Sequence, residues 1–231
     1  MYHSQNQDKC PPPADIPAYL DEISPPLWSS RKEAFLSNSL YQEREALFMA
    51  YQPGNVDLVC LGDSITQKFE WQDALPAWRV ANRGIGSDTT GGMCARLDSI
   101  KVMNPVTISL MAGVNDLMSQ TPEDSAASYA ALLDALAQEL PKTTVIVTGV
   151  LPVTEAHSID NQNIRTLNQF IADICQKRNI RFLDLYGVFA GEDGCLKPQY
   201  ALDTVHLSPE GYRLWLSYLV PVLKDVLPSQ Q

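Results

Sequence analysis

The sequence predicts a three-layer α/β/α domain built around a five-stranded parallel sheet. Short, almost wholly apolar segments alternate along the chain with longer segments that carry helix-start signals. This alternation is typical of a parallel sheet covered by helices on both faces, and the apolar segments are of the kind that forms strands buried on both sides. Small polar residues follow several of these segments, at the position where ligands bind in open parallel sheets.

Five apolar segments are the predicted strands, and turn-forming residues end several of them. Gly62 permits a sharp turn after the first segment, and residues 83–90 close the second with two glycines. These glycines complete no G-x-G-x-x-G pattern, so nucleotide binding is not predicted. The predicted strands lie at 56–61, 79–82, 106–111, 145–150 and 180–185.

The segments that follow the strands contain residues that favour the first turn of a helix. Ser87 or Asp88 is expected to cap one helix, Thr121 with Pro122 opens another, and Ser208 with Pro209 starts the last. The segment at 65–73 is expected to be helical or irregular. The predicted helices lie at 87–100, 121–140, 161–178 and 209–227.

The first 55 residues are predicted to form a proline-rich arm followed by one helix. Residues 1–26 hold six of the sixteen prolines and are expected to be extended. A helix is predicted from Ser29 or Ser30 to about Gln52, and it should pack on the domain through Phe35, Leu36, Leu40, Leu47 and Tyr51. The predicted division of the chain is therefore 1–55 and 56–231.

Length and charge limit the classes of function. The 231 residues suit one α/β domain with a sizeable core. The 17 basic and 27 acidic residues give a net charge of −10, which disfavours nucleic acid and anionic membranes as partners. No run of about 18 apolar residues predicts a transmembrane segment. The first ten residues lack the apolar core of a signal peptide, so a cytoplasmic location is expected.

The cysteines lead to the same expectation about the compartment. They are odd in number and scattered along the chain without metal-ligand spacing, at positions 10, 60, 94, 175 and 195. They predict five free thiols in a reducing cytoplasm and no metal site.

Three loops that follow predicted strands carry small polar residues and would meet at one edge of the sheet. The first holds Gly62-Asp63-Ser64, the second spans 84–88 and the third spans 113–116. A serine in the first loop can act as a nucleophile if a base reaches it, and it can equally cap the following helix. Taken alone, capping is the commoner role of such a serine.

Only one of the three histidines has a carboxylate at a suitable spacing. Asp203 stands three residues before His206, so it can orient an imidazole whose other nitrogen takes the proton of Ser64. His3 lies in the arm, and His157 lies in a loop after the fourth predicted strand. An isolated Asp-x-x-His is more often a surface turn, so it is the combination of motifs that favours catalysis.

These motifs resemble the SGNH-hydrolase superfamily of GDSL esterases and lipases. The resemblance rests on Gly62-Asp63-Ser64, on Gly113-Val114-Asn115-Asp116, and on Asp203-Thr204-Val205-His206. Residues 82–90 and the segment after His206 look closest to the platelet-activating-factor acetylhydrolase catalytic subunits and similar bacterial acetylesterases. The resemblance covers residues 56–227 and implies a sheet of flavodoxin-like strand order.

The resemblance implies a catalytic triad and no metal or cofactor. Ser64 would be the nucleophile, His206 its base and Asp203 the residue that orients the imidazole, while Asp63 would support the loop rather than react. The implied reaction is hydrolysis of carboxylic esters through an acyl-serine intermediate, with acetyl or another short acyl group favoured. Acetylated sugars or lipids are the implied type of substrate, and a homodimer is possible.

The resemblance also implies an oxyanion hole, at which the sequence departs from the family. The donors would be the Ser64 N–H, the Asn115 side chain and the backbone N–H of a glycine in the second motif. That glycine position falls on Ser87, with Gly86 one residue earlier as the second candidate. A backbone donor needs no particular side chain, but the hydroxymethyl group of serine reduces the room for the acyl group.

Two other functions fit the same residues: acyl transfer to a bound alcohol, and ligand binding without turnover on the same fold. An α/β-hydrolase elbow fits less well, because Thr66 stands where the second glycine of Gly-x-Ser-x-Gly is required. A phosphoacceptor role for Asp63 would leave the other motifs without functions. Trp71 and Trp78 are interpreted either as core residues or as a platform for a sugar.

Overall fold

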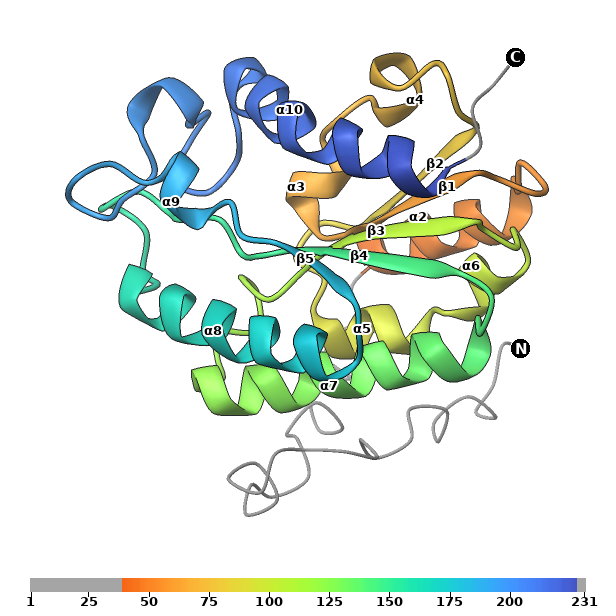
Figure 1. Cartoon of the computed structure of the whole chain (residues 1–231), viewed down its shortest axis with the longest axis horizontal. Coiled ribbons are helices and arrows are strands. Elements are labelled where there is room, and N and C mark those ends of the chain that lie inside the picture. Colours follow the sequence, from red (N-terminus) through yellow and green to blue (C-terminus); the bar gives the residue numbers. More distant parts are fainter. Residues whose placement is uncertain (1–38, 228–231) are drawn as a thin grey trace.

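Five parallel strands form the central sheet, in the order β2-β1-β3-β4-β5 (Figure 1). This is the flavodoxin-like order, so the predicted fold class is confirmed. The computed structural model describes residues 39–227, so the predicted arm and the predicted helix start at Ser29 or Ser30 lie outside the described residues. The division of the chain at residue 55 stays a prediction. The strands are Leu58–Gly62 (β1), Val80–Gly84 (β2), Thr107–Met111 (β3), Thr144–Thr148 (β4) and Arg181–Leu183 (β5).

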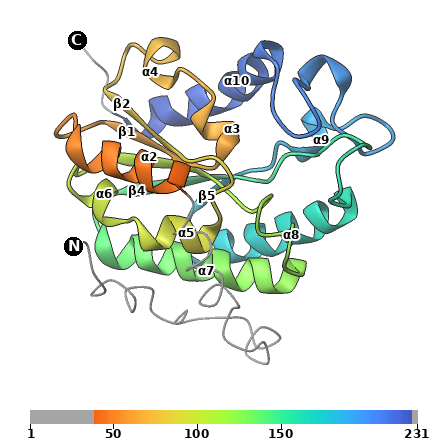
Figure 2. The same cartoon turned by 180° about the vertical axis from the view of Figure 1, so that it is seen from behind.

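Helices cover both faces of the sheet, and Figures 1 and 2 show the three layers from opposite sides. One face carries α5 (Thr90–Ala95), α6 (Asp98–Lys101), α7 (Pro122–Glu139) and α8 (Asn161–Lys177). The other face carries α3 (Ser64–Gln67), α4 (Trp71–Ala74), α9 (Tyr186–Phe189) and α10 (Pro209–Val226), with a short 3₁₀ turn, η1 (Pro198–Tyr200), before α10. The helix α2 (Ser39–Ala50) lies beside the β2 edge (Figure 2).

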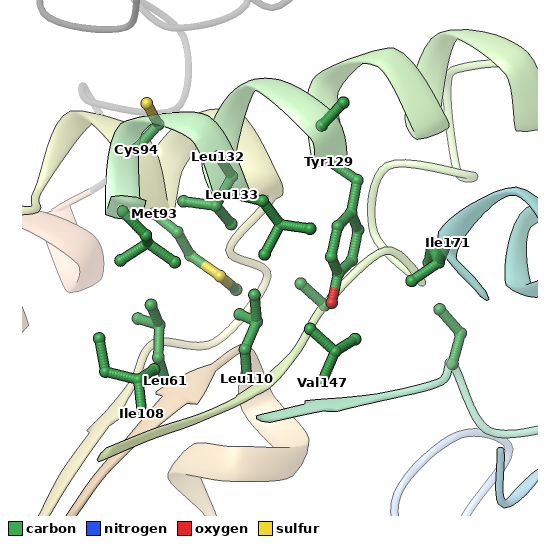
Figure 3. Packing of buried hydrophobic residues seen from close by; sticks show 14 of the residues in the cluster. Leu61, Met93, Cys94, Ile108, Leu110, Tyr129, Leu132, Leu133, Val147 and Ile171 are labelled. Atoms are coloured by element: carbon green, nitrogen blue, oxygen red, sulfur yellow. The ribbon is translucent and has the colours of Figure 1, made fainter. Parts of the chain in front are cut away.

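The sheet separates two hydrophobic cores. On the side of α7, the strand residues Leu61, Leu110 and Val147 face Tyr129 and Leu133 of that helix, and all five are buried (Figure 3). Burial of the apolar strand residues on both faces is what holds the parallel sheet together, since each fully buried large aliphatic side chain contributes about 1.5–3 kcal/mol.

Tryptophans dominate the second core, under α10. Trp71 and Trp215 meet edge to face with ring centroids 5.1 Å apart, and the Trp71 indole N–H donates to the Thr66 carbonyl at 2.8 Å. Trp71 and Trp78 are 1% and 7% exposed. The core interpretation of these two residues is therefore confirmed, and rings buried to this extent cannot serve as a platform for a sugar.

Most predicted helices and strands are present, but one helical segment differs from the prediction. The segment 65–73, expected to be helical or irregular, is covered by the short helices α3 and α4, whereas the helix predicted at 87–100 is divided into α5 and α6. Neither Ser87 nor Asp88 is the N-cap of α5: the cap is Thr89, whose hydroxyl accepts the Gly92 N–H at 3.2 Å. Asp88 lies one residue before this cap, and its carboxylate accepts the Thr89 N–H and binds the Arg96 guanidinium.

The helix α2 presents a different face to the domain than its sequence suggests. Leu47 and Tyr51, which were expected to pack on the domain, are 51% and 78% exposed, whereas Tyr41 and Phe48 are buried. The prediction of the buried stripe is therefore wrong at these two residues. Apolar residues occur on more than one face of this helix, so its periodicity does not fix its orientation.

The cysteines also differ from the prediction. Cys60, Cys175 and Cys195 have free thiols, but Cys94 is disulfide-bonded, so the expectation of five free thiols is wrong at that residue. Disulfide formation depends on the separation of two cysteines in the folded chain, which their sequence spacing does not reveal. The cytoplasmic location stays a prediction. Within residues 39–227, no helix combines the length and the apolar character needed to cross a membrane.

Candidate active site

The strand register brings three of the predicted motif loops to one edge of the sheet. Gly62, the last residue of β1, pairs with Gly84 at the end of β2 and with Met111 at the end of β3. The loops that follow these three strands therefore start at the same level. Residues 63–64, 85–89 and 112–116, which are far apart in the sequence, converge at the carboxyl edge, where ligands bind in open α/β sheets.

The turn after β1 leaves Ser64 free of a capping role. Asp63 is the N-cap of α3, and its Oδ1 accepts the Ile65 N–H at 2.9 Å. A Cβ atom at Gly62 would lie 2.1 Å from the Thr66 hydroxyl oxygen and 2.7 Å from the Met111 carbonyl oxygen, so only glycine fits there. Asp63 thus supports the loop as expected, and Ser64 is the first residue of α3 and is partly exposed.

The structure places the three residues of the predicted triad in one hydrogen-bonded series. His206 Nε2 lies 2.8 Å from Ser64 Oγ, and His206 Nδ1 lies 2.6 Å from Asp203 Oδ2. Asp203 Oδ1 also accepts the backbone N–H of His206 at 2.8 Å and of Val205 at 2.9 Å. The side chain of His206 is 16% exposed and that of Asp203 is 46% exposed. The imidazole is therefore held on one side by a carboxylate and faces a hydroxyl on the other.

Local hydrogen bonds fix the loop that carries Asp203 and His206. The Leu202 N–H donates to the His206 carbonyl at 2.8 Å, which closes the loop just before α10. Ser208 caps that helix by accepting the Gly211 N–H at 3.2 Å, and Pro209 occupies its first turn, as the sequence predicts. The Tyr212 hydroxyl of α10 donates to the Ile65 carbonyl at 2.6 Å, which ties the helix after His206 to the helix that begins with Ser64.

A tight turn after β2 carries the two candidate backbone donors. The Asp88 N–H donates to the Ile85 carbonyl at 3.2 Å, so Gly86 and Ser87 are the central residues of this turn. Ser87 has φ of 61°, in the left-handed region that the third residue of a type II turn requires and that favours glycine. Ser87 adopts this conformation at a steric cost that a glycine would not have.

The two N–H groups of this turn differ in their partners. The Gly86 N–H donates to Oε1 of Gln67, on α3. Among the described residues, the Ser87 N–H has no acceptor, and neither has the Ser64 N–H. The sequence offered both Gly86 and Ser87 as donors, and the structure leaves only the second unoccupied. Gln67 belongs to none of the motifs, so the sequence did not mark it as part of this site.

The loop after β3 positions the Asn115 amide. Gly113 has φ of 120°, and a Cβ atom there would meet Val150 and Leu167 at 3.0 and 3.1 Å, so this bend requires glycine. Asn115 Nδ2 donates one hydrogen to the Asp88 carbonyl at 2.8 Å, which links the loops after β2 and β3. A primary amide nitrogen carries two hydrogens, so a second donor remains at Asn115.

The residues of this site lie within a segment that matches a known protein family. The sequence pattern of the GDSL-like lipase/acylhydrolase family matches residues 60–214, more than half of the chain. The chain belongs to this family. Members of the family hydrolyse esters, so the chain is an ester hydrolase by descent. None of the curated proteins matches the chain.

Several solved structures share the fold of this chain. A Streptococcus pneumoniae protein provisionally named a platelet activating factor is 21% identical, covers 83% of this chain and 95% of its own, and has a TM-score of 0.71. A GDSL-like lipase from Bacteroides thetaiotaomicron is 24% identical, with coverages of 80% and 97% and a TM-score of 0.68. An acetyl xylan esterase is 20% identical, with coverages of 71% and 98% and a TM-score of 0.62.

Three buried carboxyl groups lie among the motif loops of this GDSL-family chain. Burial is the main cause that raises the pKa of Asp63 and Asp88 to about 7 and that of Asp116 to about 6. Asp88 pairs with Arg96, whose Nε lies 2.8 Å from Oδ2 while both side chains are fully buried. Asp116 accepts both the N–H and the hydroxyl of Thr90.

The Arg96 guanidinium joins several parts of the site. Besides its bond to Asp88, its Nη2 donates to the Arg83 carbonyl at 2.8 Å and to the Gly62 carbonyl at 3.3 Å. It therefore connects the ends of β1 and β2 with the turn that contains Ser87. The sequence did not reveal Arg96, because Asp88 lies before α5 and Arg96 at its C-cap, and no motif joins the two residues.

The other histidine of the described chain, His157, lies close enough to Asp203 and His206 for both to act on its pKa, but it is not part of this hydrogen-bonded series. His157 Nδ1 accepts the Ile159 N–H at 3.1 Å, and burial lowers the pKa of its imidazole. None of its hydrogen bonds within residues 39–227 goes to Ser64 or Asp203. As expected from the sequence, it is a loop residue that stabilises its own turn.

Proposed function

We propose that this chain is a serine esterase that hydrolyses short-chain acyl esters, acetyl esters above all, through an acyl-serine intermediate. The observation that carries the proposal is the hydrogen-bonded series from Ser64 Oγ through the imidazole of His206 to the carboxylate of Asp203. A hydroxyl, an imidazole and a carboxylate in this order are what activates a serine for attack on an ester carbonyl.

His206 is the proposed base and acid. Asp203 accepts the Nδ1–H, which leaves the Nε2 lone pair facing the hydroxyl of Ser64. As Ser64 Oγ attacks the carbonyl carbon, its proton passes to Nε2, and the imidazolium then gives this proton to the leaving alkoxide. Water attacks the acyl-serine in the second half of the reaction, with His206 again as the base.

Asp203 is suited to stabilise the imidazolium. Partial burial acts to raise the pKa of its carboxyl group, but the backbone N–H groups of His206 and Val205 and the His206 imidazole outweigh it. The pKa of Asp203 is therefore held well below its usual range, and the group is ionised throughout the working pH range. A fixed negative charge beside Nδ1 favours the protonated imidazole that forms in the transition state.

The proposed oxyanion hole consists of the Ser64 N–H, the Ser87 N–H and the second hydrogen of the Asn115 amide. These donors come from the three loops that follow β1, β2 and β3, whose last residues are paired in register at the carboxyl edge of the sheet. Two are backbone donors without an acceptor among the described residues, and the third belongs to an amide held in place by the Asp88 carbonyl. Donors fixed before the reaction stabilise the developing negative charge without reorganisation.

Two considerations favour a short acyl group. The Ser87 side chain adds a hydroxymethyl group to a turn where the family motif has glycine. A Cβ atom built at the neighbouring Gly86 would lie 4.0 Å from the Ser64 Cβ, so this turn borders directly on the nucleophile. One protein of the same fold is described as an acetyl xylan esterase. This likeness supports an acetyl group on the substrate of this chain, but it does not define the alcohol to which that group is attached.

The test is a burst assay with 4-nitrophenyl acetate on the full chain, together with labelling by a fluorophosphonate. The wild type should release nitrophenol with turnover and carry one label, whereas Ser64→Ala should show neither. A matched series of acetyl, butyryl and octanoyl esters should show the highest kcat/KM for acetyl. Failure of the folded wild type to hydrolyse any of these esters would favour ligand binding without turnover. Acylated alcohol among the products after addition of an alcohol would point to acyl transfer.

A further inference from the structure

The helix α2 lies outside residues 60–214, which match the family pattern, yet it touches the turn that carries Ser87. Its Tyr41 hydroxyl donates to the Gly92 carbonyl at 2.9 Å, in α5, which follows the turn. Its Arg44 Nε lies 3.5 Å from the Gly84 carbonyl, at the end of β2, which precedes the turn. Figure 2 shows α2 in front of the β2 edge, with α5 and α6 on the same side of the molecule.

The apolar centre of this contact is Phe48. Tyr41, Phe48 and Ile85 form a small buried cluster of their own, separate from the two main cores, and Ile85 is 2% exposed. The two guanidinium groups of Arg44 and Arg83 lie over the Phe48 ring, at 4.9 and 4.5 Å from its centroid. Ile85, the first residue of the turn, is thus packed in one cluster with the two rings that α2 supplies, Tyr41 and Phe48.

The buried arginine in this contact depends on the same ring. Arg83 is 5% exposed, and its Nε and Nη2 have no hydrogen-bond partner among residues 39–227. Burial is the main cause that lowers the pKa of this guanidinium to about 10. The face of Phe48 offers an electrostatically favourable neighbour to an otherwise poorly solvated cation. The ring therefore holds both Arg83, at the end of β2, and Ile85, in the turn.

The turn itself needs such support. Ser87 adopts a left-handed conformation that costs an L-residue other than glycine free energy, and such conformations persist where the surrounding structure holds them. On one side, two hydrogen bonds anchor the turn. The Ile85 N–H donates to the Gly62 carbonyl at 3.1 Å, and the Gly86 N–H donates to the side-chain carbonyl of Gln67. The Asn115 amide holds the Asp88 carbonyl, and on the side of α2 the anchor is the buried cluster of Ile85 with Phe48 and Tyr41.

We propose that Phe48 is a positioning residue of the esterase site: through Ile85 it holds the Ser87 N–H in the orientation that stabilises the oxyanion. This inference rests on the proposed function. Because the oxyanion exists only in the transition state, loss of the Phe48 ring should lower kcat and leave KM nearly unchanged. Misplacement of a reacting or stabilising group by about 1 Å can cost up to about 100-fold in rate.

The first experiment compares Phe48→Ala with Leu47→Ala in the full chain, with 4-nitrophenyl acetate as substrate. Leu47 is on the same helix but 51% exposed, so its truncation is the matched control. Phe48→Ala should lower kcat by about 10- to 100-fold with KM within about threefold, and Leu47→Ala should leave both constants unchanged. Equal kcat in the two folded variants, or an effect of Phe48→Ala on KM alone, overturns the proposal.

A double mutant separates positioning from a general loss of stability. In the Ser87→Gly background the left-handed turn carries no steric cost, so the turn needs less support. Phe48→Ala should then lower kcat by less than about threefold, which measures a coupling between two residues on different elements. If Phe48→Ala lowers kcat as much in the Ser87→Gly background as in the wild type, the proposal is contradicted. If Phe48→Ala does not fold, Ile85→Val, which truncates the other side of the contact, takes its place in the same comparison.

Hydrogen exchange tests the inference without turnover. The Ile85 and Asp88 amides, which donate to the Gly62 and Ile85 carbonyls at 3.1 and 3.2 Å, should exchange faster in Phe48→Ala than in Leu47→Ala. Unchanged exchange at both amides overturns the proposal. Absence of ester hydrolysis by the folded wild type would instead reject the proposed function, and the exchange rates would still decide whether Phe48 holds the turn.

Discussion

Gln67 and Gly86 are joined by a hydrogen bond in which the side-chain carbonyl accepts the backbone N–H. The bond links the helix that begins with Ser64 to the turn that carries Ser87. It also gives the Gly86 N–H a fixed partner, whereas the adjacent Ser87 N–H has no acceptor among the described residues. A single amide side chain thus distinguishes between two donors that the sequence could not separate.

Loss of this bond should impair catalysis. Gln67→Ala frees the Gly86 N–H and removes an anchor of the turn, so kcat should fall by roughly tenfold, with little change in KM. Lys68→Ala, an exposed neighbour on the same segment, is the control. Steady-state kinetics with 4-nitrophenyl acetate make the measurement. Full activity of folded Gln67→Ala would mean that the turn keeps its shape without Gln67.

The two histidines in the described part of the chain should differ sharply. His206→Ala removes the group that bonds Ser64 and Asp203, so kcat should fall by several orders of magnitude, as when a member of a triad is removed. His157→Ala should retain activity, since its imidazole bonds only its own loop. Comparable losses in two folded variants, checked by circular dichroism, would contradict the assignment of the base.

Removal of the Asn115 donor should act on the chemical step. Asn115→Ala is expected to lower kcat by about 10²- to 10³-fold, the loss typical of one oxyanion donor. Asn115→Asp keeps the shape of the side chain but replaces a donor with a negative charge. The kcat of this variant should therefore fall by at least as much as that of Asn115→Ala. An effect confined to KM would instead assign Asn115 to substrate positioning.

Substitution of Ser87 separates the roles of its backbone and side chain. Ser87→Gly relieves the left-handed strain at φ of 61° and should raise the free energy of unfolding by roughly 1 kcal/mol while activity is retained. Ser87→Ala should stay active, because the N–H is unchanged. Ser87→Pro removes this N–H and fixes a negative φ, so it should lower kcat as Asn115→Ala does. Thermal melts establish folding, and an inactive Ser87→Ala would give the hydroxyl a chemical role.

The buried carboxyl groups predict how stability depends on pH. Burial raises the pKa of Asp63 in the folded chain to about 7, above its value in the unfolded chain. The stability that this group contributes is therefore fully present below about pH 4 and is lost as the pH rises through about 7. Asp63→Asn removes this dependence, so the Tm of the variant relative to the wild type should be higher at pH 8 than at pH 5. Exposed Asp173→Asn is the control, and an equal Tm difference at both pH values contradicts the argument.

The sequence by itself determined the features that depend on residues close together in the chain. Ser208 and Pro209 mark the start of α10, and Thr121 with Pro122 marks the start of α7, because a cap acts within one helical turn. The apolar strands follow from the same local patterns. The motifs at Ser64, Asn115 and His206 pointed to one site through their resemblance to the GDSL family, and the strand register brings the loops after the first three strands together.

Only the tertiary structure decided the features that join distant segments. The choice between the N–H groups of Gly86 and Ser87 depends on a side chain nineteen residues away, at Gln67. The face that α2 buries depends on the cluster that Tyr41 and Phe48 form with Ile85, and its own apolar periodicity favoured Leu47 and Tyr51 instead. Such pairings form when packing brings side chains into contact, and the free energy of packing belongs to the assembled surfaces rather than to either segment alone.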